Sequence, residues 1–577
     1  MIILGINDVA HHNTSAALIM DGHVISAIEE ERISRVKLDN HYPFQSIQAV
    51  LEQSNIALED IDIIALAGLD RKQQRPATNR LFKQIRRAAK TDQKIRIFYL
   101  KKQFDRYARL FRSRPSVPGF LSNKKIITIE HHHAHAASAY YTSPFSKNER
   151  IGVMTLDGSG DAVSASVWLA EHGRLKHICS LPTTSSLGHI YSAFTVHLGF
   201  KHTRHEGKVL GLAAFGNPEP MLSRLLALTE IGNWDQLLQP ELMRLTLRFA
   251  SGMGVETAAA LAKGLSHEDI AAGLQAFTET VALAFIQEQI RKLQVNKLAL
   301  AGGVFANVKL NQRILGLEEV ESIYIHPNMG DGGLAAGAAL EAHATLADSP
   351  EPCFMQTAYQ GHNIDEADAR QALTQAKLIF TQPDNLAEEV ATLLADGKVV
   401  ARASGRMEYG PRALGNRTVM AICTDPDINK WLNDKFQRTE FMPFAPVVLE
   451  KHAAEYFPDW KPEHIAARFM TLTYDVSEKG QKEIPAAVHV DNTARPQVIR
   501  KEDNPDYYDI LAAYHQKTDI AGLINTSFNM HEEPIVCDEH DAIRAWQQAG
   551  LDALILGPFL ILQTDNMNIQ KGTESDI

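Results

Sequence analysis

The chain of 577 residues is too long to fold around a single hydrophobic core, so we expect two or more domains. Apolar residues make up 45% of the sequence and charged residues 22%, which is typical of a soluble globular protein and excludes a mainly disordered chain. The formal net charge is -11, but this charge is unevenly distributed.

The segment 71–114 is strongly basic. It holds 16 lysines and arginines against two aspartates, so its local charge is +14. Such a segment could attract nucleic acid or a membrane surface. Because charge runs are more often solvated faces, we favour a solvated helical insertion, with no membrane partner and nucleic acid disfavoured.

The ends and the cysteines indicate the compartment. No apolar run reaches the roughly 18 residues that a membrane-spanning helix needs, and no basic segment precedes an apolar one at the start of the chain. The four cysteines form no C-x-x-C pair, which argues against a disulfide framework and a thiolate metal site; they are Cys179, Cys353, Cys423 and Cys537. We therefore expect a cytoplasmic protein.

The first elements in the chain are short strands joined by polar turns. Apolar runs predict strands at 2–7, 16–20 and 23–28. The same pattern of strand, turn and strand is predicted a second time, with strands at 151–156 and 162–169 on either side of a Gly-rich turn at 157–161. Two such strand–turn–strand units predict a duplicated fold.

Helices and strands alternate further along the chain, which predicts α/β architecture. A long amphipathic helix at 268–293 is followed by a strand at 297–301 and a turn at Gly302-Gly303. Another strand, at 322–326, leads to Gly330-Asp331-Gly332-Gly333 and an Ala-rich helix. We place a first domain at 1–347, a linker at 348–365 and a second domain at 366–577.

A histidine cluster at 131–135 gives the sharpest local signal. His131 and His135 lie one turn apart on one face of a predicted helix, the spacing at which two imidazoles can bind one metal ion. Solvated or helix-capping histidines are the simpler alternative. Two further ligands must come from elsewhere, and Asp157 and Asp331 are suitable because each lies in a Gly-rich turn.

Gly-rich turns between strands and helices also suit phosphate binding, because their backbone N–H groups can approach an anion closely. Each turn alone is weak, since most such turns are only turns, but together they favour a nucleotide site. The candidate residues are Gly158, Ser159, Gly160, Lys208, Gly302, Gly303, Asn307 and Gly330.

The second domain carries clustered cations in a segment rich in glycine and proline. Guanidinium groups match phosphoryl oxygens with two parallel hydrogen bonds, whereas surface ion pairs are the simpler alternative. Neutral donors follow the predicted strand 520–524. The candidate residues are Arg406, Arg412, Arg417, Lys435, Arg438, Arg495, Asn525 and Ser527.

Several motifs occur together and in order. They are Ile3-Leu4-Gly5-Ile6-Asn7 with His12, His131 to Ser138, Glu206 to Ala214, Gly410 to Gly415, Pro443-Phe444-Ala445-Pro446 and Asn525 to Asn529. This series, over nearly the whole chain, resembles the O-carbamoyltransferases of nodulation-factor and antibiotic biosynthesis.

The resemblance implies an actin/hexokinase-like N-terminal domain and a YrdC-like C-terminal domain. It implies that carbamoyl-adenylate forms from carbamoyl phosphate and ATP, with magnesium, in the C-terminal domain. The carbamoyl group then passes to a hydroxyl of a small-molecule acceptor in the N-terminal domain, and AMP is released. The acceptor itself stays open, as does a homodimeric state.

Carried over by residue, the resemblance makes His131, His135, Asp157 and Asp331 ligands of an iron(II) ion or of a similar ion such as zinc or manganese. It places His12 near the transferred group as a general base or carbonyl-polarising group. Met442 stands where some members have an arginine, which puts phosphate contacts from that loop in doubt.

Two other functions remain open. A tRNA threonylcarbamoyl-type modification enzyme would account for the basic segment, and a nucleotide-sensing protein of the actin-like fold would show no turnover.

Overall fold

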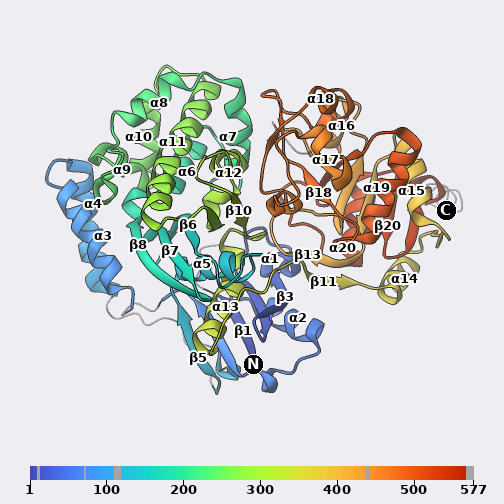
Figure 1. Cartoon of the computed structure of the whole chain (residues 1–577), viewed down its shortest axis with the longest axis horizontal. Coiled ribbons are helices and arrows are strands. Elements are labelled where there is room, and N and C mark those ends of the chain that lie inside the picture. Colours follow the sequence, from blue (N-terminus) through green and yellow to red (C-terminus); the bar gives the residue numbers. More distant parts are fainter. Residues whose placement is uncertain are drawn as a thin grey trace, which may run out of the picture. The chain divides into compact units, whose positions relative to one another are not determined.

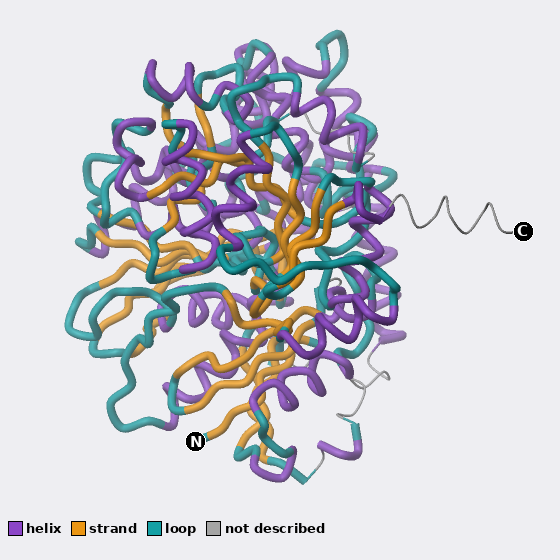
Figure 2. Tube along the Cα trace, turned by 90° about the vertical axis from the view of Figure 1, so that its right-hand side faces the viewer, coloured by secondary structure: helices purple, strands orange, loops and turns teal. Residues whose placement is uncertain are grey.

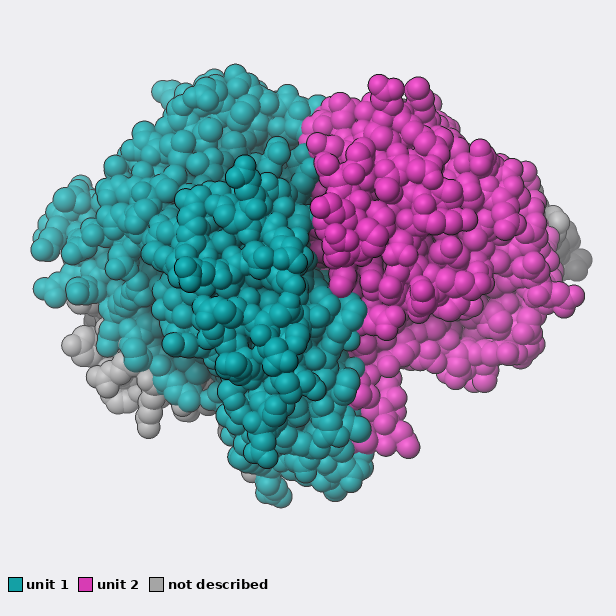
Figure 3. Space-filling model, viewed as in Figure 1, with its two compact units in different colours: residues 1–11, 17–24, 57–354 teal, residues 12–16, 25–56, 355–577 magenta. Residues whose placement is uncertain are grey.

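The computed structural model describes residues 1–8, 13–69, 73–109, 118–121, 123–247, 249–436 and 442–566. The chain forms two compact units, coloured separately in Figure 3. Unit 1 comprises residues 1–11, 17–24 and 57–354, and unit 2 comprises residues 12–16, 25–56 and 355–577. The candidate residue His12 lies outside the described residues.

The units are discontinuous, unlike the uninterrupted domains that we expected. Residues 25–56 belong to unit 2, because their side chains bond to the C-terminal half of the chain. Arg32 Nη2 donates to the carbonyl of Gly410 (2.8 Å), and Arg35 Nη2 donates to the carbonyl of Pro534 (2.8 Å). Such long-range partners leave no signal in the local sequence pattern.

Two five-stranded sheets have the same internal order. The first has the order β3-β2-β1-β4-β5, and the second, read from its other end, has the order β8-β7-β6-β9-β10. In each sheet the order is therefore third, second, first, fourth and fifth strand. The strands are β1 (Ile2–Asn7), β2 (Ser15–Met20), β3 (His23–Glu29), β4 (Ile63–Ala67), β5 (Lys125–Ile129), β6 (Ile151–Gly160), β7 (Val163–Glu171), β8 (Arg174–Pro182), β9 (Lys297–Ala301) and β10 (Ser322–Ile325).

The pairing directions are repeated as well. β4 pairs in parallel with β1, and β9 pairs in parallel with β6. β5 and β10 extend the sheets in parallel in the same way. This repeat confirms the predicted duplicated α/β fold of the actin/hexokinase-like type.

A group of helices beside the second sheet packs mainly helix on helix (Figure 1). They are α6 (Leu187–His197), α7 (Glu206–Leu212), α8 (Glu219–Leu226), α9 (Pro240–Leu247), α10 (Met253–Leu261), α11 (His267–Leu293) and α12 (Val308–Leu315). By length and composition α11 could cross a membrane, a feature that the sequence analysis did not single out. Because 67% of its most apolar stretch is buried in the structure, it has the character of a core helix.

The helices α5 (His131–Tyr141) and α13 (Leu334–Leu346) pack unusually closely. A Cβ atom on Gly337 of α13 would lie 1.9 Å from the carbonyl oxygen of Ala134, and one on Gly5 of β1 would lie 2.0 Å from that of Ala335. Only glycine fits at these two contacts. The close approach fixes the start of α5 relative to the turn that precedes α13.

The basic segment forms two helices, α3 (Arg75–Ala88) and α4 (Gln93–Arg109), at one side of unit 1 in Figure 1. On α3, the side chains of Lys83, Arg86 and Arg87 are exposed, and Lys83 lies three and four residues before the two arginines, hence on the same face. This arrangement agrees with the favoured interpretation as a solvated helical insertion.

Unit 2 is a mixed α/β structure around a seven-stranded sheet of order β18-β15-β19-β14-β12-β20-β21. Figure 2 shows the helices, strands and loops of the whole chain along its Cα trace. The strands of this sheet are β12 (Val400–Ala403), β14 (Arg417–Ala421), β15 (Ala445–Leu449), β18 (Gln497–Ile499), β19 (Gly522–Ser527), β20 (Ala553–Leu556) and β21 (Phe559–Leu562).

Shorter pairs and helices complete unit 2. The helices are α1 (Glu30–Ser34), α2 (Phe44–Ser54), α14 (Glu366–Gln375), α15 (Leu386–Ala395), α16 (Ile428–Lys435), α17 (Glu450–Tyr456), α18 (Glu478–Glu483), α19 (Pro505–Thr518) and α20 (Glu539–Ala549). Outside the main sheet, β11 (Tyr359–Ile364) pairs with β13 (Gly405–Glu408), and β16 (Tyr474–Asp475) pairs with β17 (Thr493–Ala494). The implied likeness to YrdC stays a prediction.

Candidate functional site

Four side chains from three parts of the chain meet in unit 1. His131 and His135 come from the first turns of α5, Asp157 from β6, and Asp331 from the turn that follows β10. One ligand atom from each residue lies within 4.8 Å of the others. The structure therefore brings together the four residues that the sequence analysis grouped.

The ring nitrogens face carboxylate oxygens at distances longer than hydrogen bonds. His131 Nε2 lies 3.4 Å from Asp157 Oδ2 and 3.5 Å from Asp331 Oδ1, and His135 Nε2 lies 3.5 Å from the same Asp331 atom. Two atoms that each lie about 2.1 Å from one tetrahedral ion are about 3.4 Å apart. The spacing thus suits a metal ion better than direct contact.

The cluster is buried and has unsatisfied donors, which also fits a metal ion. Both nitrogens of His135 and Nε2 of His131 have no hydrogen-bond partner among the described residues. His135 is 0% exposed and Asp331 9% exposed. Unpaired buried groups are costly, and two imidazoles with two carboxylates form a donor set that suits iron(II), zinc or manganese.

The electrostatics favour a positive charge between the four groups. Burial alone would lower the pKa of His131, but the carboxylates of Asp331 and Asp157 raise this pKa to about 10. Burial would raise the pKa of Asp157, yet His131 and His135 hold this pKa well below its usual range. A proton or a bound cation can supply the charge.

Neighbouring groups hold the ligands in place. The backbone N–H of Gly303 donates to Asp157 Oδ1 (2.9 Å), and Asn7 Nδ2 donates to the carbonyl oxygen of Asp331 (2.9 Å). The N–H of His131 donates to Asp161 Oδ2 (2.9 Å). Such contacts around the ligands fix their orientation before an ion binds.

The two middle histidines of the cluster have other roles. His132 is fully buried between Thr155 Oγ1 (2.7 Å) and the carbonyl of Val163 (3.0 Å), and burial followed by the charge of His131 lowers its pKa to about 3. His133 stacks on Trp168 with ring centroids 4.2 Å apart. These two residues support the fold around the ligands.

The Gly-rich segment at Asp157 differs from its prediction. We expected a turn at 157–161, but β6 continues to Gly160 and the turn falls at Asp161-Ala162. A register shift between Leu156 and Gly160 in the ladder with β7 accommodates the extra residues. Strand pairing, which the local sequence does not reveal, decides this boundary.

Several candidate nucleotide residues have structural roles in unit 1. Asn307 accepts from the N–H of Leu310 and so caps α12. Gly302 has φ 106°, a conformation that favours glycine, and a Cβ atom there would lie 2.2 Å from the carbonyl oxygen of Leu156. Ser159 Oγ lies 3.5 Å from His189 Nε2.

The remaining candidates in this group differ in environment. Lys208 is buried on α7, whereas a Cβ atom on Gly330 would meet nothing within 4 Å. A Cβ atom on Gly158 would lie 3.4 Å from the ring of His189, an ordinary contact. Nucleotide binding by these residues stays a prediction.

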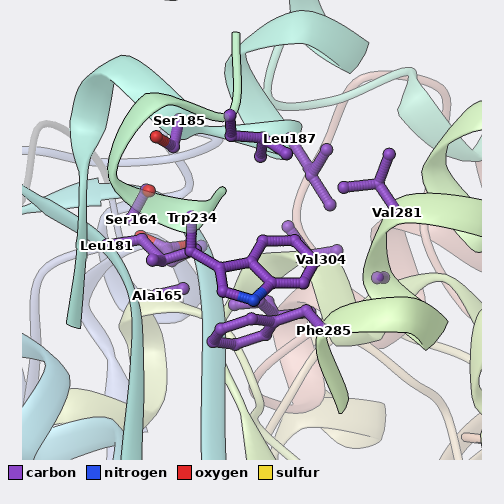
Figure 4. Close-up of a pocket in the computed structure, with 13 residues that line it drawn as sticks. Ser164, Ala165, Leu181, Ser185, Leu187, Trp234, Val281, Phe285 and Val304 are labelled. Atoms are coloured by element: carbon purple, nitrogen blue, oxygen red, sulfur yellow. The ribbon is translucent and has the colours of Figure 1, made fainter. Parts of the chain in front are cut away.

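A small pocket, part of it open to solvent, adjoins Asp157 (Figure 4). Trp234 and Phe285 form one wall, with ring centroids 5.0 Å apart. Its 13 lining residues are mostly apolar and include no lysine or arginine. The pocket therefore lacks the cations that a nucleotide phosphate prefers.

In unit 2, the loop 409–416 is held by side chains from distant parts of the chain. Glu408 Oε1 accepts from the N–H groups of Leu414 (2.8 Å) and Asn416 (2.8 Å). The carbonyls of this loop accept from Arg402, Gln497, Tyr359 and Asn525. The loop that carries Arg412 is thus ordered in advance of any ligand.

Arg412 and Arg495 form the cationic part of this region. Burial lowers the pKa of Arg412 well below its usual range, and the nearby charge of Arg495 lowers it further. Arg412 Nε has no hydrogen-bond partner among the described residues. Two half-buried guanidinium groups whose charges act on each other favour a bound anion, which would relieve their mutual repulsion.

The structure gives other predicted phosphate-binding residues structural positions. Arg417 is 0% exposed, and its guanidinium donates to the carbonyls of Cys537, Ser404, Gly405, Asn416 and His362. Arg406 donates to the carbonyls of Ile25, Gln360 and Gly361. The donors of both residues are thus engaged with the protein backbone.

The remaining candidates of unit 2 are dispersed. Lys435 is exposed and lies over the ring of Trp431 at 5.2 Å. Asn525 and Ser527 lie within β19 and not after it, because the strand pairs as far as Ser527. Asn525 donates to Gln497 (2.7 Å) inside the sheet. Arg438 lies outside the described residues.

Two family profiles cover most of the chain. The profile described as "Carbamoyltransferase N-terminus" matches residues 2–340, and that described as "Carbamoyltransferase C-terminus" matches residues 391–563. The chain belongs to the carbamoyltransferase family. This carbamoyltransferase therefore carries its buried four-residue cluster in the N-terminal part of the family architecture and its arginine pair in the C-terminal part.

Relatives with assigned names include nodulation proteins. The carbamoyltransferase is 31% identical to nodulation protein NolNO of Sinorhizobium fredii over 95% of this chain and 79% of that protein. It is 25% identical to nodulation protein U of Rhizobium tropici over 90% of each chain. An uncharacterized protein of Synechocystis is 32% identical over 97% of each chain.

The comparison with solved structures found partial matches. Full-length HypF, in its phosphate- and nucleotide-bound form, covers 60% of this carbamoyltransferase and 56% of its own chain, with 18% identity and a TM-score of 0.33. A ROK family glucokinase from Streptomyces griseus, with glucose and AMPPNP, covers 59% and 98%, with 11% identity and a TM-score of 0.27.

The sequence analysis missed residues that organise both regions of the carbamoyltransferase. Glu408 and Arg402 hold the Arg412 loop, and Arg32 reaches Gly410 from far away in the sequence. One signal could have pointed to Arg32. The run Glu29-Glu30-Glu31-Arg32 follows an apolar strand, and such a charged run is buried only when its members are paired.

Proposed function

We propose that this protein is an ATP-dependent O-carbamoyltransferase that transfers a carbamoyl group to a hydroxyl of a small-molecule acceptor in the cytoplasm. One observation carries the proposal: a single chain holds a buried four-ligand cluster in one unit and an ordered arginine loop in the other. Two chemically different sites fit a reaction in two steps.

The first step belongs to unit 2. Carbamoyl phosphate, ATP and water give carbamoyl-adenylate, phosphate and pyrophosphate. Arg412 and Arg495 would bind phosphoryl oxygens, and the fixed loop 409–416 would hold Arg412 in place without a cost of ordering on binding. A preorganised cationic site also stabilises charge that develops in the transition state.

The second step belongs to unit 1. The acceptor oxygen attacks the carbamoyl carbon, the bond to AMP breaks, and the hydroxyl proton passes to a base, for which His12 is our candidate. His131, His135, Asp157 and Asp331 would hold a divalent ion, with iron(II) as the family resemblance suggests. When bound, this ion supplies Lewis-acid polarisation of the carbonyl or phosphoryl oxygen.

The contacts around the cluster support this role for the chain's own residues. Gly303 and Asn7 orient the two aspartate ligands, and burial of the cluster excludes bulk water. Exclusion of water matters because a carbamoyl-adenylate that meets solvent would hydrolyse.

The test is an assay of the two steps with purified protein. Carbamoyl phosphate should be required for pyrophosphate release from ATP, and a hydroxyl-bearing acceptor should gain the mass of one CONH unit. Arg412→Ala should stop pyrophosphate release but still transfer from synthetic carbamoyl-adenylate. Failure of this variant to use carbamoyl-adenylate would contradict the two-site division.

Two other results would favour other functions. Modification of tRNA, with binding that weakens steeply as salt rises, would favour a threonylcarbamoyl-type enzyme. Nucleotide binding without any pyrophosphate release would favour a sensor. Full-length protein is used in each case.

A further inference from the structure

The loop that carries Arg412 has an unusual backbone conformation at both ends. It is bounded by Gly410 with φ 129° and Gly415 with φ 121°, conformations that favour glycine. A Cβ atom on Gly415 would also lie 2.3 Å from Tyr507. Side chains from elsewhere must therefore fix the shape of the loop.

The C-terminal half of the loop is fixed by groups of the C-terminal sequence. Arg402 Nη1 donates to the carbonyl of Gly415 (2.6 Å), and Gln497 Nε2 donates to that of Leu414 (2.7 Å). Glu408 accepts from the backbone N–H groups of Leu414 and Asn416. The loop atoms in these contacts all belong to residues after Arg412.

The start of the loop is fixed by a residue from the N-terminal sequence. Arg32 Nη2 donates to the carbonyl of Gly410 at 2.8 Å, across 378 positions of the chain. Gly410 lies two residues before Arg412, so its position directly affects where Arg412 points.

Arg32 is itself held rigidly. It is 3% exposed, and its Nε and Nη2 atoms donate to Glu29 Oε2 at 3.2 Å and 3.1 Å. Glu31 Oε1 lies 3.7 Å from Arg32 Nη2, and Glu31 also accepts from the N–H of Leu38 (2.6 Å). Two buried carboxylates therefore keep the guanidinium charged and fixed in direction.

The Arg32 network leaves one donor unused. The Nη1 atom of Arg32 is buried and has no hydrogen-bond partner among the described residues. A buried unpaired donor is unfavourable to stability, whereas the bonds of Nε and Nη2 to Glu29 and Gly410 hold the guanidinium in one direction.

We propose that Arg32 is a positioning residue of the anion site, and that it sets the place of Arg412 by fixing the carbonyl of Gly410. The inference rests on the proposed function only for the identity of the anion. A phosphate-bearing ligand at Arg412 is sufficient for the positioning role itself.

The test compares Arg32→Lys with Arg35→Lys in the full-length protein. Lysine keeps the charge at residue 32 but cannot bond to Glu29 and Gly410 with a planar fork. Arg35 is the matched control. It belongs to the same segment and bonds to the carbonyls of Arg32 (3.0 Å), Ile535 (2.7 Å) and Pro534 (2.8 Å), none of which is in the Arg412 loop.

Calorimetric titration with inorganic phosphate and with carbamoyl phosphate measures the site without turnover. We expect Arg32→Lys to raise the Kd for both anions, and the KM for carbamoyl phosphate in pyrophosphate release, by about tenfold, with kcat changed by less than about threefold. Hydrogen exchange of peptides that span 409–417 should become faster. Arg35→Lys should leave Kd and KM within about twofold of the wild type.

Several results would overturn the inference. They are an unchanged Kd in Arg32→Lys, an equal loss in Arg35→Lys, or a wild type that binds neither anion. If Arg32→Lys does not fold, Glu29→Gln is titrated instead, and an unchanged Kd in that variant also overturns it. A wild type that binds phosphate but releases no pyrophosphate refutes the proposed function, while the Kd of Arg32→Lys still decides the role of Arg32.

Discussion

Gly160 lies directly against the imidazole of His131. A Cβ atom on Gly160 would lie 2.0 Å from Cγ and 2.1 Å from Cδ2 of that ring. The glycine at the end of β6 therefore makes room for a metal ligand on α5, which gives this residue a steric role in addition to the predicted nucleotide contact.

Gly160→Ala should displace the His131 ring and so lose bound metal. We expect metal content, measured by elemental analysis, to fall at least about tenfold and carbamoyl transfer to fall with it. Gly316→Ala is the control, because a Cβ atom there would lie 3.5 Å from its nearest neighbour. Full metal content in Gly160→Ala would contradict the steric role.

His135→Ala should separate the two steps of the reaction. Without one of the four ligands, we expect loss of metal and a fall in transfer of about 100-fold or more, whereas pyrophosphate release by unit 2 continues. His133→Ala serves as the control, because His133 stacks on Trp168 from the same helix and is not one of the four ligands. Transfer by metal-free His135→Ala would exclude a role for the ion.

Arg417→Met should reduce stability more than it alters substrate affinity. The substitution removes the guanidinium that donates to five carbonyls, three of them part-buried, and we expect the free energy of unfolding to fall by about 3 kcal/mol or more. Urea unfolding measures the loss. Arg291→Met, which removes an exposed pair with Glu319, should shift the unfolding midpoint little, and equal shifts in the two variants would refute the prediction.

His362 should make the stability of unit 2 depend on pH. Burial, and then the charge of Arg417, lower the pKa of His362 below its usual 6.5. Because the unfolded chain takes up this proton first, stability is full above pH 6.5 and is lost as pH falls below it, at up to about 1.4 kcal/mol per pH unit. Melting temperatures of the wild type and His362→Gln at pH 7.5 and 5.5 measure this effect.

Between pH 7.5 and pH 5.5, the melting temperature of His362→Gln should fall less than that of the wild type. Identical losses would show that His362 titrates alike in the folded and unfolded chains.

Predictions that depend only on neighbouring residues, such as strand bounds and the spacing of two histidines on one helix, agree with the structure. The bounds of β1 and β9 and the one-turn spacing of His131 and His135 follow from apolar runs and helix geometry, and the grouping with Asp157 and Asp331 follows from strand-end turns. The extension of β6 to Gly160 depends on its register with β7, which no local signal encodes.

Partners far away in the sequence explain the other differences. Arg417 was expected at a phosphate site because a guanidinium in a glycine-rich segment has no obvious local partner. Its true partners include the carbonyls of His362 and Cys537, residues 55 and 120 positions away. Every residue has a backbone carbonyl, so the sequence does not indicate which carbonyls will accept hydrogen bonds from an arginine.

The discontinuity of unit 2 has a consequence for biosynthesis. Residues 25–56 leave the ribosome early, but Arg32 and Arg35 also bind carbonyls of Gly410, Pro534 and Ile535, which are translated several hundred residues later. Until those residues are translated, Arg32 and Arg35 lack these backbone acceptors. A nascent chain that stalls before residue 410 would expose this segment to chaperones and proteases, so the two halves are poor candidates for separate expression.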